Sequence, residues 1–428
     1  MHRSLLYAAS LLFLFNELVL GFSTPKNNAL KSSSHQTCNK IRLWNEAPLG
    51  TKVNGDAAAT RLDGTSSVDT NGSSPTSPPN DVGVTTSNDP STELLRKTNS
   101  EPVSKAPFPL VLWRFTRPHT LIGSAIAIPS IFLLASPTYG TFFTKQSFAA
   151  LMYAAVPSLL MNLYITGLNQ ITDVEIDKIN KPELVIAKGD LKKSTAIAVV
   201  LTALAISLMM SAVHPVFSTT GLQVALWGSF ILGTMYSLPP FRMKRHPLLA
   251  AFCIVAVRGT IINAGFYSHA LTAAFNAVGS AANMANTGVV QCILHDWKCL
   301  SSSLFFGIFG IVIALMKDVP DAVGDRIFNI RSFTVRVGQT RVFGMMKNLL
   351  TILFGAVGTA LIQRATVAST VTDSVRRALV GAGCLVAAWS TQHEAKDVNA
   401  EDSGEVYNYY MHLWKLFYLS YFALPFIK

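Results

Sequence analysis

The sequence has few charged residues and few cysteines. Only 14% of its 428 residues are charged and 50% are hydrophobic, whereas a soluble domain carries roughly 25% charged residues. This composition argues against a soluble protein. The five cysteines form no Cys-x-x-Cys pair and have no histidine at metal-ligand spacing, so neither a zinc site nor a disulfide framework is expected. Cys292 and Cys299 share one predicted loop and could pair in an oxidising lumen, but two unrelated thiols is the simpler interpretation.

The basic residues do not resemble a nucleic-acid-binding surface. The net charge is +11, but the Lys and Arg residues lie in short loops between apolar runs and are not interleaved with aromatic residues in one patch. Membrane topology explains this distribution better, because positive charges collect on one side of a membrane protein.

The first 107 residues differ in composition from the rest. Residues 1–21 have the basic start and short apolar core of a signal peptide, and residues 22–107 are rich in hydroxyl residues, with no acid until Glu46. We expect a signal peptide, then a transit peptide and disordered low-complexity leader, then a membrane domain over 108–428. The order resembles the bipartite leaders of algae with secondary plastids and predicts a plastid (chloroplast) membrane. A simple secretory signal with a disordered tail is the alternative.

The membrane domain contains repeated apolar runs of about the length that crosses a bilayer, which is about 20 residues. They predict an all-α fold, a polytopic membrane helical bundle of about nine transmembrane helices. The runs are 119–136, 148–168, 194–213, 221–238, 247–270, 301–317, 342–362, 375–391 and 409–427. Counting crossings places loops 169–193, 239–246 and 318–341 on one side, and these loops hold 12 Lys and Arg residues, against five on the opposite side, as expected for a cytoplasmic-type face.

The first polar motif follows the second apolar run. Asn169, Asp173 and Asp177 are spaced i, i+4 and i+8, so on a helix their side chains share one face. Like charges one turn apart destabilise a helix, which favours a bound cation. Pro182 is expected to stop this helix. A solvated loop with scattered acids is the weaker interpretation.

The second polar motif follows the sixth run. Asp318, Asp321 and Asp325 are spaced i, i+3 and i+7 and are again predicted to share a helical face. Pro320 and Gly324 indicate that the helix bends or breaks there. Because the two motifs lie in loops on the same side, we expect them to face each other across a cavity.

Opposed acid clusters fit a Mg²⁺-diphosphate. Mg²⁺ prefers one or two carboxylates together with waters and substrate phosphate oxygens, and no twelve-residue EF-hand loop is present for calcium. The ion would act as a Lewis acid and template, and the carboxylates need not titrate.

Basic residues between the motifs provide candidates for binding phosphate. Tyr236, Lys244 and Arg245 lie in one loop region, where Lys244 is the better candidate and Arg245 fits a topological role equally well. Arg258 lies within the fifth apolar run, where a charge is costly and usually functional. It could pair with an aspartate cluster, the diphosphate or an acceptor carboxylate, and the diphosphate is the expected partner. Asn263 is expected to form a hydrogen bond in helix packing.

Both aspartate motifs and the segment 236–245 resemble those of UbiA-type aromatic prenyltransferases. Three further segments are similar to homogentisate phytyltransferases of plastids: WRFTRPHT at 113–120, IRSFTVRVGQ at 330–339, and WKLFY at 414–418 with LPF at 424–426. The resemblance covers about 113–428. Two features depart from the family pattern: Val185 and Lys188 replace a usual Pro and Ser, and the segment 271–300 is longer than usual.

The resemblance implies Mg²⁺-dependent transfer of a phytyl group from its diphosphate to homogentisate with decarboxylation, the committed step towards tocopherols (vitamin E). By the motif matches, the catalytic carboxylates are Asp173, Asp177, Asp318, Asp321 and Asp325. The same five carboxylates, together with Asn169, would bind Mg²⁺. The substrate-binding candidates are Asn169, Lys181, Tyr236, Lys244, Arg258, Lys317 and Arg331. The expected partners are these two small substrates and membrane lipid, with no nucleic acid.

Three other functions fit parts of the sequence. A homogentisate solanesyltransferase or another family member with a different donor is the nearest, because sequence does not show cavity depth. A secondary transporter would also carry polar residues in its membrane domain, although its broken helices usually lie near mid-membrane. A purely structural membrane protein would leave both acid clusters unexplained.

Overall fold

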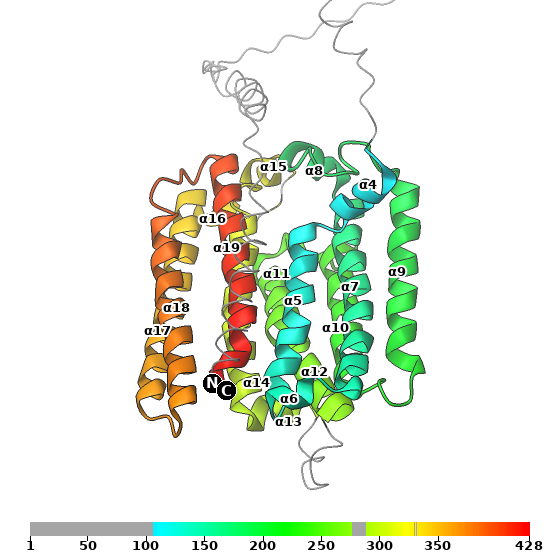
Figure 1. Cartoon of the computed structure of the whole chain (residues 1–428). Coiled ribbons are helices and arrows are strands. Elements are labelled where there is room, and N and C mark those ends of the chain that lie inside the picture. Colours follow the sequence, from blue (N-terminus) through cyan, green and yellow to red (C-terminus); the bar gives the residue numbers. More distant parts are fainter. Residues whose placement is uncertain (1–105, 276–287, 329, 331) are drawn as a thin grey trace, which may run out of the picture. The chain divides into compact units, whose positions relative to one another are not determined.

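The regular structure of the described residues is entirely helical (Figure 1). The computed structural model describes residues 106–275, 288–328, 330 and 332–428. The predicted signal peptide, residues 1–21, and nearly all of the predicted transit peptide and leader, residues 22–107, lie outside this part of the chain. Within it, the predicted all-α class is confirmed.

Each of the nine predicted apolar runs forms a long helix in the described part of the chain. The helices are α5 (Pro118–Ala135), α7 (Lys145–Thr172), α9 (Lys193–Val213), α10 (Thr220–Ser237), the composite helix Pro247–Phe275, α14 (Trp297–Lys317), α17 (Gln339–Thr366), α18 (Val371–His393) and α19 (Ser403–Ala423). Six of them are long and apolar enough to cross a membrane: α5, α7, α9, Pro247–Phe275, α14 and α17. The protein is therefore a polytopic membrane helical bundle.

Short helices lie at the two ends of the bundle (Figure 1). At one end are α4 (Phe108–Phe115), α8 (Val174–Asn180), α15 (Ala322–Ile327) and α16 (Phe333–Val337). At the other end are α6 (Tyr139–Phe142) and α13 (Val289–His295). The two motif-bearing helices, α8 and α15, thus share one end, as the count of crossings predicted. The described part of the long segment 271–300 lies at the opposite end.

The composite helix Pro247–Phe275 is not a regular α-helix. Its α-helical parts, α11 (Pro247–Ile254) and α12 (Ile262–His269), alternate with π-helical turns at Val255–Ile261 and Ala270–Phe275. A π-turn shifts the hydrogen-bond register and leaves carbonyl groups in need of other donors. Asn263 supplies one, because its Nδ2 donates to the carbonyls of Arg258 at 2.6 Å and Gly259 at 3.3 Å. Tyr421 of α19 donates to Asn263 Oδ1 at 3.4 Å, so Asn263 also links two helices, as its packing role predicted.

Glycines allow two pairs of helices to approach backbone to backbone. A Cβ on Gly221 of α10 would lie 2.5 Å from the carbonyl oxygen of Gly265 in α12, and one on Gly259 would lie 2.7 Å from Cα of Gly307 in α14. Small residues at such contacts are typical of membrane helices, which associate through close packing rather than through the hydrophobic effect. The close approach fixes the composite helix against both neighbours.

We expect Gly221→Ala to lower the thermal stability of the protein. The new methyl group meets backbone atoms that cannot turn away, and overpacking of this kind costs about 1–3 kcal/mol. The measurement is the unfolding temperature of detergent-solubilised protein, with Gly355→Ala on α17 as the control, because nothing lies within 4 Å of a Cβ there. Equal unfolding temperatures for the two variants would contradict the close contact.

Candidate active site

The first acid motif spans the junction of α7 and α8. Asp173 lies between the two helices with φ −112° and ψ 15°, yet the backbone hydrogen bonds continue across it. The N–H of Asp173 donates to Asn169 O at 3.2 Å, and the N–H of Asp177 donates to Asp173 O at 2.7 Å. The one-turn spacing of Asn169, Asp173 and Asp177 is thereby retained although the helix is interrupted.

The second acid motif spans the junction of α14 and α15. α14 ends at Lys317 with Asp318 as its C-cap, and Asp321 is the N-cap of α15. The predicted break is confirmed, because Pro320 has no N–H to donate and its ring blocks a continuing helix. The prediction that all three acids share one helical face is wrong for Asp318, which belongs to the end of α14. Asp321 and Asp325 remain one turn apart, with the N–H of Asp325 donating to Asp321 O at 3.0 Å.

Two contacts join α8 to α15. Lys181, the C-cap of α8, donates from Nζ to Asp321 Oδ1 at 2.6 Å and also contacts Oδ2. Asn180 Oδ1 accepts a hydrogen bond from the N–H of Gly324 at 3.0 Å. A Cβ on Gly324 would overlap Asn180 Oδ1, so a larger residue at this position would displace the Asn180 amide. We name the pair of contacts the α8–α15 clasp. Sequence reasoning identified Lys181 but missed Asn180, whose only sequence signal is its place beside Lys181.

The basic loop after α10 binds the first motif. Lys244 Nζ lies 2.5 Å from Asp173 Oδ2 and 3.3 Å from Thr172 Oγ1, and Arg242 Nη2 lies 3.2 Å from Asp173 Oδ1. Burial lowers the pKa of Lys244 to about 8, against the raising effect of Asp173. The predicted Lys244 is therefore at the motif. Arg242, another basic residue of the segment 236–245, is there too, whereas Arg245 is exposed.

Two carboxyl groups of the motifs are buried with incomplete electrostatic compensation. Burial raises the pKa of Asp177 to about 6, although Arg117 and Lys181 oppose the shift. Burial and the charges of Asp318 and Asp321 raise the pKa of Asp325 to about 7. Asp177 Oδ2 has no hydrogen-bond partner among the described residues. A cation at this end of the bundle would satisfy these groups.

The carboxylates fit a metal ion that is bound partly by the protein and partly by waters and substrate phosphate oxygens. Within the described ranges, no three Asp, Glu, His or Cys side chains converge on one metal position. Mg²⁺ prefers one or two carboxylates completed by waters and phosphate oxygens, which is compatible with this arrangement. The ammonium groups of Lys181 and Lys244 already show that Asp321 and Asp173 attract cations.

A cavity of about 240 Å³ lies inside the bundle, between α5, α7, α10, the composite helix, α14 and α19. Four of the predicted substrate-binding residues line it: Asn169, Tyr236, Arg258 and Lys317. Lys317 Nζ also lies 3.9 Å from Asp318 Oδ1, so the cavity adjoins the second motif. Arg331 lies outside the described residues.

Arg117 also lines the cavity, although sequence reasoning assigned it no role in the site. It is the N-cap of α5, in the left-handed conformation with φ 51°. Burial raises the pKa of Asp177, and the positive charge of Arg117 opposes that rise, so Arg117 connects the cavity to the first motif. The segment 113–120 contained Arg117, but nothing in that pattern distinguished it from Arg114.

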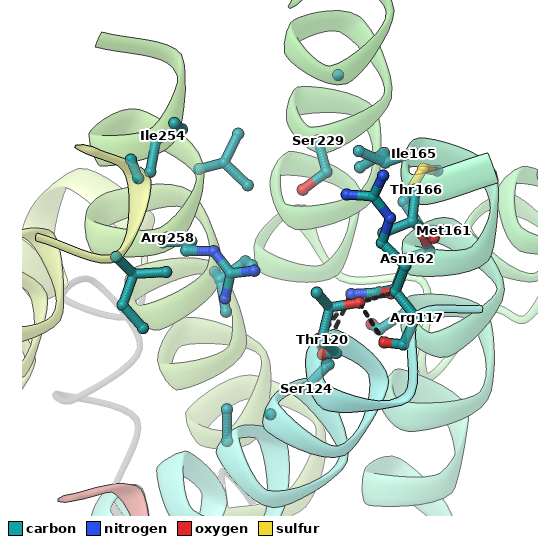
Figure 2. Close-up of a pocket in the computed structure, with 18 of the residues that line it drawn as sticks. Arg117, Thr120, Ser124, Met161, Asn162, Ile165, Thr166, Ser229, Ile254 and Arg258 are labelled. Atoms are coloured by element: carbon teal, nitrogen blue, oxygen red, sulfur yellow. Dashed lines mark hydrogen bonds between the residues drawn. The ribbon is translucent and has the colours of Figure 1, made fainter. Parts of the chain in front are cut away.

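A polar group on α5 and α7 forms one wall of the cavity (Figure 2). Thr120 Oγ1 donates to Asn162 Oδ1 at 3.1 Å, and Asn162 Nδ2 donates to Ser124 Oγ at 3.1 Å. No sequence pattern pointed to Asn162, because its partners lie about forty residues away on another helix. Arg258 reaches into the cavity from the opposite wall (Figure 2). Its guanidinium carbon lies 5.2 Å from the ring centre of Trp414 and 5.7 Å from that of Phe417.

Comparison with known proteins finds relatives along most of the chain. Homogentisate phytyltransferase 1, chloroplastic, of Arabidopsis thaliana is 38% identical over 321 residues, which cover 74% of this chain and 75% of that protein. Homogentisate geranylgeranyltransferase of Triticum aestivum is 34% identical over 318 residues, covering 74% of this chain and 72% of that protein.

Among solved structures, a UbiA homolog from Archaeoglobus fulgidus bound to GPP and Mg²⁺ is 14% identical with a TM-score of 0.48, covering 74% of this chain and 99% of that one. The model of the UbiA prenyltransferase family matches residues 120–416. That match spans well over half of the sequence and includes both acid motifs and most of every helix that lines the cavity. The chain belongs to the UbiA prenyltransferase family.

Proposed function

We propose that this protein transfers a phytyl or geranylgeranyl group from its diphosphate to homogentisate, with loss of CO₂, in a plastid membrane. The observation that carries the proposal is the pair of acid motifs, joined by basic side chains, beside a cavity in a membrane bundle. The names of the related phytyl- and geranylgeranyltransferases support the acceptor and the two donors. Membership of a prenyltransferase family favours this enzyme over the secondary transporter.

The charged end of the bundle would hold the diphosphate. Asn169, Asp173 and Asp177 on one side and Asp318, Asp321 and Asp325 on the other would bind Mg²⁺. When bound, the ion neutralises phosphate charge and stabilises the leaving diphosphate. Lys181, Lys244 and Arg242 already contact these carboxylates and can turn their N–H groups to phosphate oxygens. Lys317 would contribute from the cavity side.

The cavity would hold the reacting carbon atoms. Breaking the C–O bond leaves an allylic cation, which the faces of aromatic rings stabilise by cation–π contact. Tyr236, Trp414 and Phe417 line the cavity and supply such faces. The electron-rich ring of the acceptor then forms the new C–C bond and loses a proton. Loss of CO₂ leaves an electron pair on the benzylic carbon, which takes up a proton, so the two proton transfers cancel.

The proposal is tested with membranes that contain the expressed protein. They are incubated with homogentisate, Mg²⁺ and a panel of isoprenoid diphosphates, and the products are identified by mass. We expect a methylated prenyl quinol from phytyl or geranylgeranyl diphosphate. Product only from much longer donors would instead identify a solanesyltransferase, and no prenylated quinol from any donor would refute the proposal.

We expect Asp173→Asn and Asp321→Asn each to reduce turnover by several orders of magnitude while the protein still inserts. The charge that these carboxylates balance develops mainly as the C–O bond breaks, so its loss acts on the transition state. The control is Glu175→Gln on α8, whose side chain is 71% exposed and pairs only with Lys178 among the described residues. Near-normal turnover with Mg²⁺ in either aspartate variant would remove that residue from the site.

We expect Gly324→Ala to lower turnover at least about tenfold, because the added methyl group displaces Asn180 and opens the α8–α15 clasp. Misplacement of a catalytic group by about 1 Å can lower the rate about 100-fold. Asn180→Ala should cost less, and the double variant should be no worse than Gly324→Ala alone, because contacting residues are not additive. Gly344→Ala on α17, with nothing within 4 Å of its Cβ, is the control. Additive losses in the double variant would show that the two residues act independently.

A further inference from the structure

Arg258 is a cation inside the cavity that forms no ion pair with any described acid. Three basic residues at the charged end have carboxylate partners: Lys181 contacts Asp321, while Lys244 and Arg242 contact Asp173. Arg258 instead lies against the rings of Trp414 and Phe417. A charge within a membrane helix is costly and is kept where it serves a function. Pairing with an aspartate, one of the three partners that the sequence allowed for Arg258, is therefore not seen among the described residues.

The π-turn gives Arg258 its position in the cavity. Arg258 lies in the turn Val255–Ile261, and Asn263 holds its carbonyl group at 2.6 Å. A π-turn changes the direction of the side chains relative to an α-helix and often occurs at functional sites. A Cβ built on Gly310 of α14 would lie 3.6 Å from Cβ of Arg258. The absence of a side chain at Gly310 therefore leaves room for the long side chain of Arg258.

The opposite wall offers a hydrogen-bond acceptor (Figure 2). The amide of Asn162 uses both of its N–H groups, one to Ser124 Oγ at 3.1 Å and one to Thr120 O at 3.4 Å. Its Oδ1 accepts one hydrogen bond, from Thr120 Oγ1 at 3.1 Å, and keeps a second lone pair. Because Asn162 lines the cavity, this lone pair can accept a hydrogen bond from a hydroxyl group of a ligand.

We infer that Arg258 binds the carboxylate of the aromatic acceptor and that Asn162 accepts a hydrogen bond from its ring hydroxyl. The inference rests on the proposed function, because homogentisate carries both groups on one ring. The diphosphate is served by the basic residues already placed at the acid motifs, which leaves Arg258 for a second anion within the cavity. A guanidinium binds a carboxylate through two parallel hydrogen bonds, and the rings of Trp414 and Phe417 hold its plane.

This assignment predicts that Arg258 discriminates acceptor from product. Homogentisate is an anion, whereas the prenylated quinol has lost its carboxylate as CO₂ and is neutral. Arg258 thus contributes to binding of the acceptor and not of the product. Asn162 contacts a group that both molecules retain, so it contributes to both.

The test uses the full-length protein with Arg258→Lys and Arg258→Gln. We expect the KM for homogentisate to rise by about 10- to 100-fold, as expected for loss of hydrogen bonds to a charged group, while the KM for the donor changes less than about twofold. Binding is measured separately by thermal shift of solubilised protein. Homogentisate should stabilise the wild type and not the variants, whereas methylhydroquinone, which lacks the carboxylate, should stabilise all three equally. Asn162→Ala should weaken both ligands.

The matched control is Arg364→Lys and Arg364→Gln. Arg364 also lies over a tryptophan ring, 5.8 Å from the centre of Trp297, but it is exposed and does not line the cavity. We expect both KM values to be unchanged in these variants. If Arg258→Gln does not fold, Arg258→Lys decides, because it retains the charge and loses the paired hydrogen bonds.

Three outcomes would overturn the inference. One is a raised donor KM with unchanged acceptor KM, which would assign Arg258 to the diphosphate. The second is unchanged KM values in both folded variants. The third is a thermal shift by homogentisate that survives in both variants. A wild-type protein that makes no prenylated quinol from homogentisate refutes the proposed function instead, and the thermal-shift series still reports whether Arg258 recognises the carboxylate of an arylacetate.

Discussion

The candidate site depends on carboxylates that lie buried at one end of a membrane bundle. A buried charge needs a partner, and removing one partner of such a pair is strongly destabilising. The structure meets this need by bringing basic residues from other segments: Lys181 to Asp321, and Arg242 and Lys244 to Asp173. The two acid motifs, about 140 residues apart in sequence, are held together through the α8–α15 clasp. The compensation by lysine and arginine also makes this end complementary to a diphosphate with its metal ion.

Helix breaks place the polar groups where the bundle can use them. α7 and α14 each end at the same face, and the chain turns there into α8 and α15 with acids at both junctions. The third interruption, the π-turn in the composite helix, lies deeper and carries Arg258 into the cavity. Charge for the leaving group is thus concentrated at the bundle end, while one cation and an amide lie inside. This separation suits a reaction that joins a charged donor to an aromatic acceptor.

The helical fold and the placement of both acid motifs at one end of the bundle were predictable from the sequence. Apolar runs of membrane-spanning length give helices because backbone polar groups must be satisfied within the segment. Counting those helices placed both acid motifs at one end, as observed (Figure 1). The prediction that Asp318 shares a helical face with Asp321 and Asp325 was wrong. The spacing rule holds only within one continuous helix, and the helix that Asp318 caps ends before Pro320. The roles of the site residues remain predictions.

The sequence by itself determined the helices, their order and the spacing of acids along each one, because these follow from local periodicity and from the bilayer. Only the tertiary structure decided which side chains meet. Asn180 reaches Gly324, Asn162 reaches Thr120 and Ser124, and Arg258 lies against Trp414, and each contact crosses from one helix to another. Such contacts depend on how packed helices are rotated and how far apart they lie. In this protein the close contacts at glycines and the π-turn set both. Helical periodicity shows which residues share a face and does not show what that face meets.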